Sequence, residues 1–192
     1  MKKYYLYTVP ILLIVAGYFF LSNTNSSVDN YTMTTDGITY SLDYIPNKKL
    51  IERDLKGSEE SYDEISNKYK DHCYFKLNIT STGGQDILKM LSEKFGELES
   101  NEIVRILSFH SKKNFKLNIN DIEIPCSLYH LDRTFVEQKG LEIIAVFNIE
   151  SVGNEISKYG NNVAFKFNAE IFNAEMIEFN MPDNILRTLT KV

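Results

Sequence analysis

The first hydrophobic stretch of the chain runs from Tyr4 to Leu21, carries no charge and comes directly after residues 1–3 (MKK). Eighteen residues form a helix of roughly 27 Å, close to the ~30 Å thickness of a bilayer's hydrocarbon core. Both flanking lysines precede the stretch, and the next charged residue is Asp29. The positive-inside bias then places residues 22–192 outside the cytoplasm. We therefore predict a single-pass signal-anchor at 4–21, with residues 1–3 cytoplasmic and the rest periplasmic or on the cell surface.

A cleaved signal peptide is the alternative interpretation of the same stretch. Residues 4–14 would form its apolar region, and Val15-Ala16-Gly17 would supply the small-residue cleavage site. Cleavage would leave the four apolar residues 18–21 at a free N-terminus, whereas in a bilayer they complete the span. We favour the anchor over secretion. A lipid-modified N-terminus is excluded because the chain has only two cysteines, Cys73 and Cys126.

The rest of the chain fits one domain of ordinary size. Residues 22–30 (SNTNSSVDN) are small and polar and predict a flexible tether, and residues 31–192 predict a single extracytoplasmic domain. Without the two N-terminal lysines, 19 basic residues face 26 acidic ones, a net charge of −7. Nucleic acid and anionic lipid headgroups are poor partners for such a surface.

Alternating apolar and polar residues predict a domain dominated by strands. Asp36-Gly37 is a two-residue hairpin signal, and Gly83-Gly84 ends a clear alternating segment at Cys73–Thr80. Further strands are predicted at 103–109, 115–119, 122–131, 141–149, 163–172 and 176–181. Helices are predicted at 47–55 with Asn47 as cap, from Ser58 or Ser61 with the capping box Ser61/Glu64, and at 85–95.

Strands at this spacing predict a β-rich, mainly antiparallel β-sandwich with two or three inserted short helices. The order of elements from Cys73 onward resembles that of exported immunoglobulin-like sandwiches, which implies the same outline for this chain. The buried tryptophan of immunoglobulin domains has no counterpart, because the sequence contains no Trp. The fold itself implies no particular activity, since sandwiches serve adhesins, chaperones, inhibitors and enzymes alike.

The two cysteines and two nearby histidines are candidate site residues. Outside the cytoplasm Cys73 and Cys126 are candidates for a disulfide, and the alternative is two buried thiols that act as small apolar residues. A metal site from His72, Cys73, Cys126 and His130 is disfavoured, because neighbours on a strand point to opposite faces. We predict no metal site and no cofactor.

Catalytic groups are the next candidates. Ser127, His130 and Asp132 contain the residue types of a catalytic triad, but on a regular strand Ser127 faces away from the other two. Carboxylate chemistry would draw on Glu59-Glu60, Asp63-Glu64, Glu97 and Glu99, which lie in charge-rich segments typical of solvated surfaces. We predict no catalytic site.

Two functional hypotheses follow. The first is a membrane-anchored extracytoplasmic domain that binds another protein at the membrane surface, as an accessory subunit of an envelope assembly or as an immunity or inhibitor protein. Sheet edges and the 152–162 loop are its candidate contacts. The second is an exported hydrolase or small-ligand-binding protein whose site is built from distant loops. A pocket that holds His130 with a carboxylate and a nucleophile would favour the second hypothesis.

Overall fold

The structure is a computed structural model that describes residues 30–94, 98–132, 140–152, 162–170, 175–182 and 185. Its strands are β1 (Asn30–Thr35), β2 (Ile38–Ile45), β3 (His72–Ser81), β4 (Phe115–Ile119), β5 (Ile122–Asp132), β6 (Gly140–Asn148), β7 (Val163–Asn168) and β8 (Met176–Met181). Its helices are α2 (Asn47–Leu55), α3 (Tyr62–Tyr69), α4 (Ile87–Lys94), α5 (Ser100–His110) and the 3-10 turn η1 (Lys112–Asn114).

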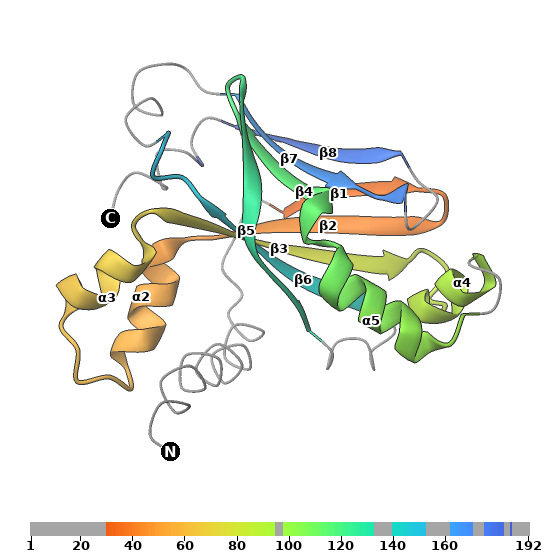
Figure 1. Cartoon of the computed structure of the whole chain (residues 1–192), viewed down its shortest axis with the longest axis horizontal. Helices are drawn as coiled ribbons and strands as arrows, with labels where there is room; N and C mark the ends of the chain where they lie inside the picture. Colours follow the sequence, from red (N-terminus) through yellow and green to blue (C-terminus); the bar gives the residue numbers. More distant parts are fainter. Residues whose placement is uncertain are drawn as a thin grey trace.

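The eight strands form one continuous sheet in the order β1-β2-β3-β6-β5-β4-β7-β8, and every pairing is antiparallel. The sheet curls until it is nearly closed and barrel-like (Figure 1). The prediction of a β-rich antiparallel domain with short helices is confirmed. The strands are hydrogen-bonded into a single sheet, however, where a sandwich would have two separate ones.

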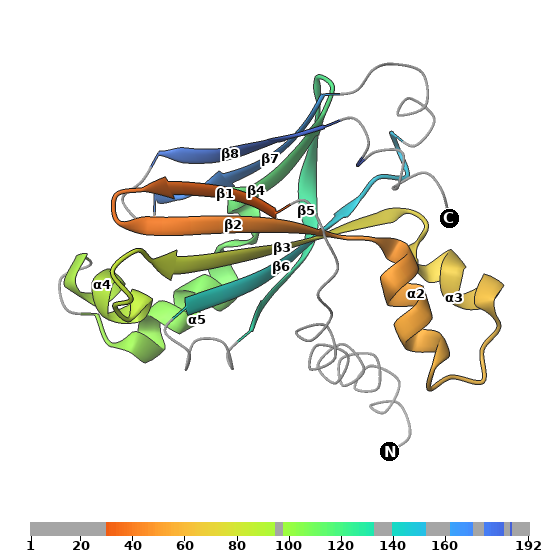
Figure 2. The ribbon, with the colours of Figure 1, turned by 180° about the vertical axis from the view of Figure 1, so that it is seen from behind.

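Strand β5 joins the two halves of this sheet. Its first residues pair with β4, and its later residues, from Cys126 on, pair with β6. The register shifts between Cys126 and Leu128, which marks a β-bulge at Ser127. A bulge bends and twists its strand. It therefore allows one long strand to turn from the β4-β7-β8 half to the β1-β2-β3-β6 half, as Figure 2 shows from behind.

The core lies between the two halves and is rich in aromatic side chains. Phe75 on β3 and Phe165 on β7 have ring centroids 5.3 Å apart. Tyr40 on β2 lies 6.3 Å from Phe167 on β7. These rings come from strands that are not hydrogen-bonded to each other, so the contacts hold the two halves face to face.

Turn chemistry matches the sequence at the two tight hairpins. Asp36 and Gly37 join β1 to β2 with φ angles of 51° and 77°, the left-handed pair of a type I′ hairpin. Asn120, with φ of 55°, begins the two-residue connection between β4 and β5. The predicted turn at Asp36-Gly37 is confirmed.

The α2–α3 pair lies at one end of the sheet and the α4–α5 pair at the other (Figure 1). The predicted capping box of α3 is confirmed: the Ser61 side chain accepts from the Glu64 N–H, and the Glu64 carboxylate accepts from the Ser61 N–H. The predicted cap of α2 is wrong. Pro46 is the N-cap residue, and Asn47 is a buried first residue of the helix.

The strand predicted at 103–109 is also wrong, because this segment is part of helix α5. Ile103 and Leu107 are buried one turn apart, while Glu102 and Arg105 form an exposed ion pair of 3.2 Å. Burial at i and i+4 with charges between is the helical pattern. The apolar, β-branched composition of the segment suggested a strand, but its spacing is helical.

Two further predictions fall on residues outside the described ranges. These are the anchor at 4–21, with all of the tether except Asn30, and residues 153–161 of the 152–162 loop. Among the described residues, no helix combines the length and the apolar character needed to cross a membrane.

Candidate functional site

Helix α2 is fastened to the start of β3 by the side chain of Asn47. Its amide nitrogen donates to the carbonyl oxygens of Tyr69, at 2.8 Å, and His72, at 3.0 Å. Asn47 is only 1% exposed, so the two bonds form away from water and one side chain ties α2 to both ends of the α3–β3 turn. The α2–α3 pair is thereby held at a defined angle beside the sheet.

Arg53, Asp54 and Tyr69 form a hydrogen-bonded group on the α2–α3 pair, which we call the helical wall. The Arg53 Nε donates to Asp54 Oδ1 at 2.7 Å, Arg53 Nη2 donates to the Tyr69 hydroxyl at 3.2 Å, and that hydroxyl donates to Asp54 Oδ2. Burial alone would raise the pKa of Asp54, but the hydrogen bonds from Arg53 and Tyr69 outweigh it and lower that pKa. Burial and the Asp54 carboxylate raise the pKa of the Tyr69 hydroxyl. Asp54 is therefore an ionised carboxylate that holds its two neighbours in place.

Strand register aligns the outward-facing side chains of β2, β3, β6 and β5 into rows. We call the first of these the apolar row, and it consists of Ile45, Tyr74, Val146 and Leu128. The next row consists of Asp43, Lys76, Ile144 and His130. The third, the polar row, consists of Ser41, Asn78, Glu142 and Asp132. Directly opposed residues on antiparallel strands have neighbouring side chains, so each row is a line of contacts across the sheet.

The bulge at Ser127 decides which residues of β5 join these rows. Cys126 lies in the core opposite Phe147, whereas Leu128 lies outside opposite Val146. On a regular strand these two residues would share a face. The Ser127 hydroxyl donates to the carbonyl oxygen of Val146 at 2.8 Å and thereby fixes the bulge to β6.

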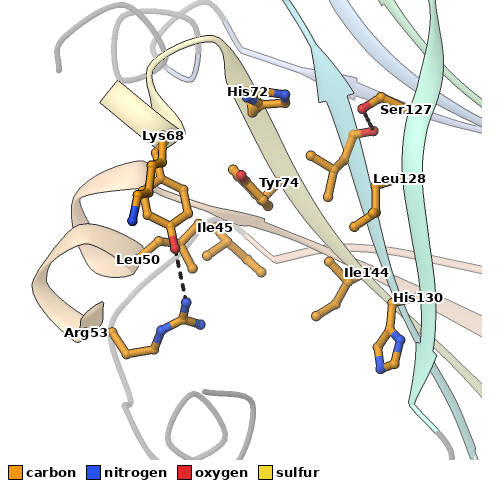
Figure 3. A pocket seen from close by; sticks show the side chains of 12 residues that line it. Ile45, Leu50, Arg53, Lys68, His72, Tyr74, Ser127, Leu128, His130 and Ile144 are labelled. Atoms are coloured by element: carbon orange, nitrogen blue, oxygen red, sulfur yellow. Dashed lines mark hydrogen bonds between the residues drawn. The ribbon is translucent and has the colours of Figure 1, made fainter. Parts of the chain in front are cut away.

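The helical wall and the apolar row enclose an open pocket of about 500 Å³. Its floor shows Tyr74, Ile144 and Leu128, with Arg53 and Lys68 on the helical side and His130 on the β5 side (Figure 3). The pocket is lined by Ile45, Leu50, Arg53, Lys68, Tyr69, His72, Tyr74, Ser127, Leu128, His130, Ile144 and Val146. Pockets of this size with apolar floors and a few polar groups are typical of binding sites.

The polar side chains of the described lining are two cations, two imidazoles and three hydroxyl groups. Among the described residues of the pocket, none is acidic. The His72 ring lies 6.4 Å from the Tyr74 ring, and its Nδ1 is buried with no hydrogen-bond partner in the described part of the chain. Leu128 is 48% exposed, which is high for a leucine on a sheet face. The pocket thus offers unused apolar surface and unused hydrogen-bonding capacity.

An acidic region lies next to the pocket, around the cation Lys76. Its Nζ is 3.6 Å from Asp43 Oδ2 and 3.9 Å from Glu142 Oε2. Glu142 is only 6% exposed and lies directly opposite Asp132. Burial raises the pKa of Glu142 to about 7. This carboxyl therefore changes charge near neutral pH.

The structure does not bring together the four side chains that were considered as metal ligands. His72 faces the pocket and Cys73 faces the core, as the alternation of strand residues predicts. Because of the bulge, Cys126 likewise faces the core while His130 faces the pocket. In the described ranges there is no group of three His, Cys, Asp or Glu side chains that could hold a metal ion.

Cys73 and Cys126 are buried free thiols. Each lies opposite Phe147, on either side of β6, so their Cα atoms are separated by two strand spacings, about 10 Å. A disulfide needs Cα atoms about 4.4–6.8 Å apart, and β6 would have to move to allow it. The Cys73 thiol donates to the carbonyl oxygen of Phe147, and burial raises the pKa of both thiols.

The triad residues are partly assembled. Because of the bulge, Ser127 and His130 both line the pocket, where regular alternation predicted opposite faces. The Ser127 hydroxyl is engaged with the Val146 carbonyl, and Asp132 lies in the polar row. A nucleophile whose proton is given to a backbone carbonyl is not activated by an imidazole.

The candidate carboxylates that the structure describes lie apart from the pocket. Four of them are exposed around the start of α3: Glu59, Glu60, Asp63 and Glu64. Glu60 pairs with Lys68, and Glu64 belongs to the capping box. Glu99 is exposed before α5, and Glu97 lies outside the described residues.

Sequence reasoning missed the Arg53–Asp54–Tyr69 group and the pocket itself. These side chains come from several separate helices and strands, so no local sequence pattern predicts them. One signal was available in β6, where residues 141–147 are almost continuously apolar (LEIIAVF). A strand that is apolar on both faces is covered on both faces, which indicates a contact surface outside the core.

No family model matches the sequence, and no curated protein is significantly similar to it. Two solved structures are similar in outline. One is a DUF4426 family protein from Pseudomonas aeruginosa PAO1, with 9% identity, a TM-score of 0.35, and coverage of 80% of this chain and 93% of that one. The other is a protein of unknown function from Burkholderia pseudomallei K96243, with 10% identity, a TM-score of 0.38, and coverage of 95% and 90%. At these TM-scores neither likeness carries an argument about family or function.

Proposed function

We propose that this chain is a membrane-anchored extracytoplasmic domain that acts by binding another protein in the pocket between α2–α3 and the sheet. The observation that carries the proposal is the apolar row, which extends across four strands on the outward face of the sheet. Outward faces of antiparallel sheets are normally polar. A partly exposed apolar stripe in a pocket is typical of an interaction site.

The position of the pocket supports a role beside a membrane. Asn30, where the described chain begins, pairs with Asp43, two residues before Ile45 in the pocket wall. Eight residues, 22–29, separate it from the predicted anchor, and a chain of that length reaches at most about 29 Å. An anchor at 4–21 therefore holds the pocket near the bilayer and raises its effective concentration toward partners there.

A second candidate function is an exported hydrolase or small-ligand-binding protein. The observation that favours it is that Ser127 and His130 line the same pocket. Against it stand the Ser127 hydrogen bond to Val146 and the absence of acidic residues from the described pocket lining. We therefore favour protein binding and propose that the chain is not an enzyme.

The finer description of the fold belongs to the same proposal. We propose that the halves of the sheet work as the two layers of an immunoglobulin-like sandwich, with β5 as the shared strand. The Phe75–Phe165 and Tyr40–Phe167 contacts between the halves support this. The outward face of the β2-β3-β6 layer is then the surface that carries the binding site.

Complementation of a null mutant at matched protein levels tests the function. Leu128→Ser and removal of residues 2–21 should each impair function while the domain stays folded, and His130→Ala should impair it less than Leu128→Ser does, because it removes no apolar floor. Phe109→Ser is the control for loss of an exposed apolar side chain, because Phe109 is 68% exposed on α5. A folded His130→Ala protein without activity, beside an anchorless protein with full activity, would overturn the proposal in favour of the hydrolase.

A further inference from the structure

We propose that the pocket takes a partner segment with bulky apolar side chains next to carboxylates, with the carboxylates turned toward α2–α3. This inference rests on the proposed function and names the chemistry of the partner. Its two halves come from separate observations: the apolar floor accounts for the bulky side chains, and the distribution of charge around the floor accounts for the acids.

The floor provides the contact area. Tyr74 and Ile144 are half-buried and Leu128 is half-exposed, and the three lie together in the open pocket. Covering them removes apolar surface from water, which is the main source of affinity in sites of this kind. A polar segment would gain nothing from this floor.

The helical side of the pocket provides cations. Arg53 and Lys68 both line it, while their own partners, Asp54 and Glu60, do not. Arg53 has five N–H donors, and in the described part of the chain Nε and Nη2 are the atoms that donate, to Asp54 and Tyr69. Donors remain for a carboxylate that arrives from the pocket. Because both cations are already paired and partly exposed, the carboxylate contributes mainly orientation and specificity.

The opposite side of the floor fixes the direction. Beyond Ile144 lie Glu142 and Asp132, with Asp43 beside Lys76. A carboxylate placed there would meet like charges. The acidic part of the partner segment must therefore lie toward Arg53 and Lys68, and its apolar part over the strands. A lysine-bearing segment would be repelled by the helical side.

Fluorescence anisotropy with three labelled octapeptides tests this proposal on the full chain in lipid nanodiscs, with empty nanodiscs as the blank. The probes have the same residue order and contain four Leu with four Glu, four Leu with four Lys, or four Ser with four Glu. We expect saturable binding of the Leu–Glu peptide alone. Binding of the Leu–Lys peptide at equal strength, or no saturable binding of the Leu–Glu peptide, would overturn the proposal.

Variants locate the binding. Leu128→Ser should weaken the Leu–Glu peptide about fivefold, because it removes exposed apolar floor. Lys68→Glu should weaken it about threefold, as expected for a partly exposed charge pair, and Lys68→Arg should restore it. Phe109→Ser and Lys113→Glu, which change exposed residues elsewhere, should leave it unchanged. Unchanged binding in Leu128→Ser contradicts the proposal, and circular dichroism of each variant separates loss of binding from loss of fold.

Different results would contradict the proposed function and the proposed chemistry of the partner. If complementation depends on Leu128 and the anchor but the Leu–Glu peptide does not bind, the chemistry of the partner is wrong and the binding function stands. If the peptide binds but complementation depends on His130 alone, the proposed function is wrong.

Discussion

The apolar row and the polar row lie on the same face of the same four strands, yet they meet different requirements. The apolar row contains Val146, which is 3% exposed, and Leu128, which is 48% exposed. The polar row contains Glu142 and Asp132, which are both buried, beside Lys76. The backbone is the same in both rows, so the difference lies in the side chains. Covering the apolar side chains is favourable in free energy, whereas covering the charged ones is unfavourable.

The largest expected effect comes from placing a charge in the apolar row. Val146→Asp buries an unpaired carboxylate in the pocket floor and should lower the free energy of unfolding by about 3–4 kcal/mol. Urea denaturation at pH 7 measures it. Asn148→Asp is the matched control, because residue 148 is exposed on the same strand and an Asp there can still accept from the Glu150 N–H, as Asn148 does. Equal losses in both variants would show that the buried position 146 and the exposed position 148 are not different environments.

The second effect comes from removing the cation beside the polar row. Lys76→Met leaves Asp43 and Glu142 without their shared partner, and we expect a loss of about 1–2 kcal/mol at pH 8. The loss should be smaller at pH 5, where Glu142 is protonated. Lys113→Met, at an exposed site in η1, should change the stability little at either pH. A loss that is the same at both pH values would mean that Lys76 acts through packing of its stem alone.

The third effect is a gain. The pKa of Glu142 is raised to about 7 in the folded protein from an ordinary 4.5, so the folded state binds more protons than the unfolded state between those values. Stability should therefore fall as pH rises from about 4.5 to 7 and stay low above it. Lys76 offsets part of this cost, so Glu142→Gln should stabilise the protein by about 1 kcal/mol at pH 8 and by nothing at pH 5.

Chemical denaturation across this pH range checks the effect of Glu142→Gln. Glu150→Gln, at an exposed carboxyl, should keep the pH dependence of the parent protein. If Glu142→Gln also keeps it, another group causes the pH dependence and the polar row is not the element that titrates.

The smallest expected effect concerns Leu128, which lies in the same apolar row as Val146. Leu128→Ser should change the free energy of unfolding by less than about 0.5 kcal/mol, because half of this side chain is already in water. The contrast with Val146→Asp separates residues kept for the fold from residues kept for a partner. Thermal unfolding is sufficient to measure it, and a loss above about 1 kcal/mol would place Leu128 with the structural residues.

The parts of the fold that depend on local patterns were predictable. Asp36-Gly37 forms its hairpin and Ser61 its capping box because both depend on residues a few positions apart. Helix α5 was misread because Ile103, Val104 and Ile106 are good strand residues, and the spacing of Ile103 and Leu107 toward the core outweighed that propensity. Propensity is a weaker signal than periodicity when the two disagree.

The pocket was not predictable because it depends on register. The rows exist only when β2, β3, β6 and β5 are aligned, and the alignment of β5 depends on one extra residue. On a regular strand the side chains of Ser127 and His130 would point to opposite faces of the sheet, but the bulge brings both of them to the pocket. Nothing in the letters CSLYHLD distinguishes a bulged strand from a regular one, since its cause is the need of β5 to pair with both β4 and β6.

The bulge at Ser127 also has a consequence for how such a protein can diverge. Before it, even-numbered residues of β5 face inward, as Ile124 and Cys126 do; after it, odd-numbered ones do, as Leu131 does. Deletion of Ser127 would restore plain alternation after Cys126 and leave Leu128, His130 and Asp132 facing outward. If Ser127 stayed and the bulge were straightened, these three side chains would point toward the aromatic interior and Leu131 would point outward. Exchanges of one amino acid for another can adjust the pocket gradually, but a one-codon insertion or deletion in β5 after the bulge would exchange the inward and outward faces of the residues that follow it in a single step.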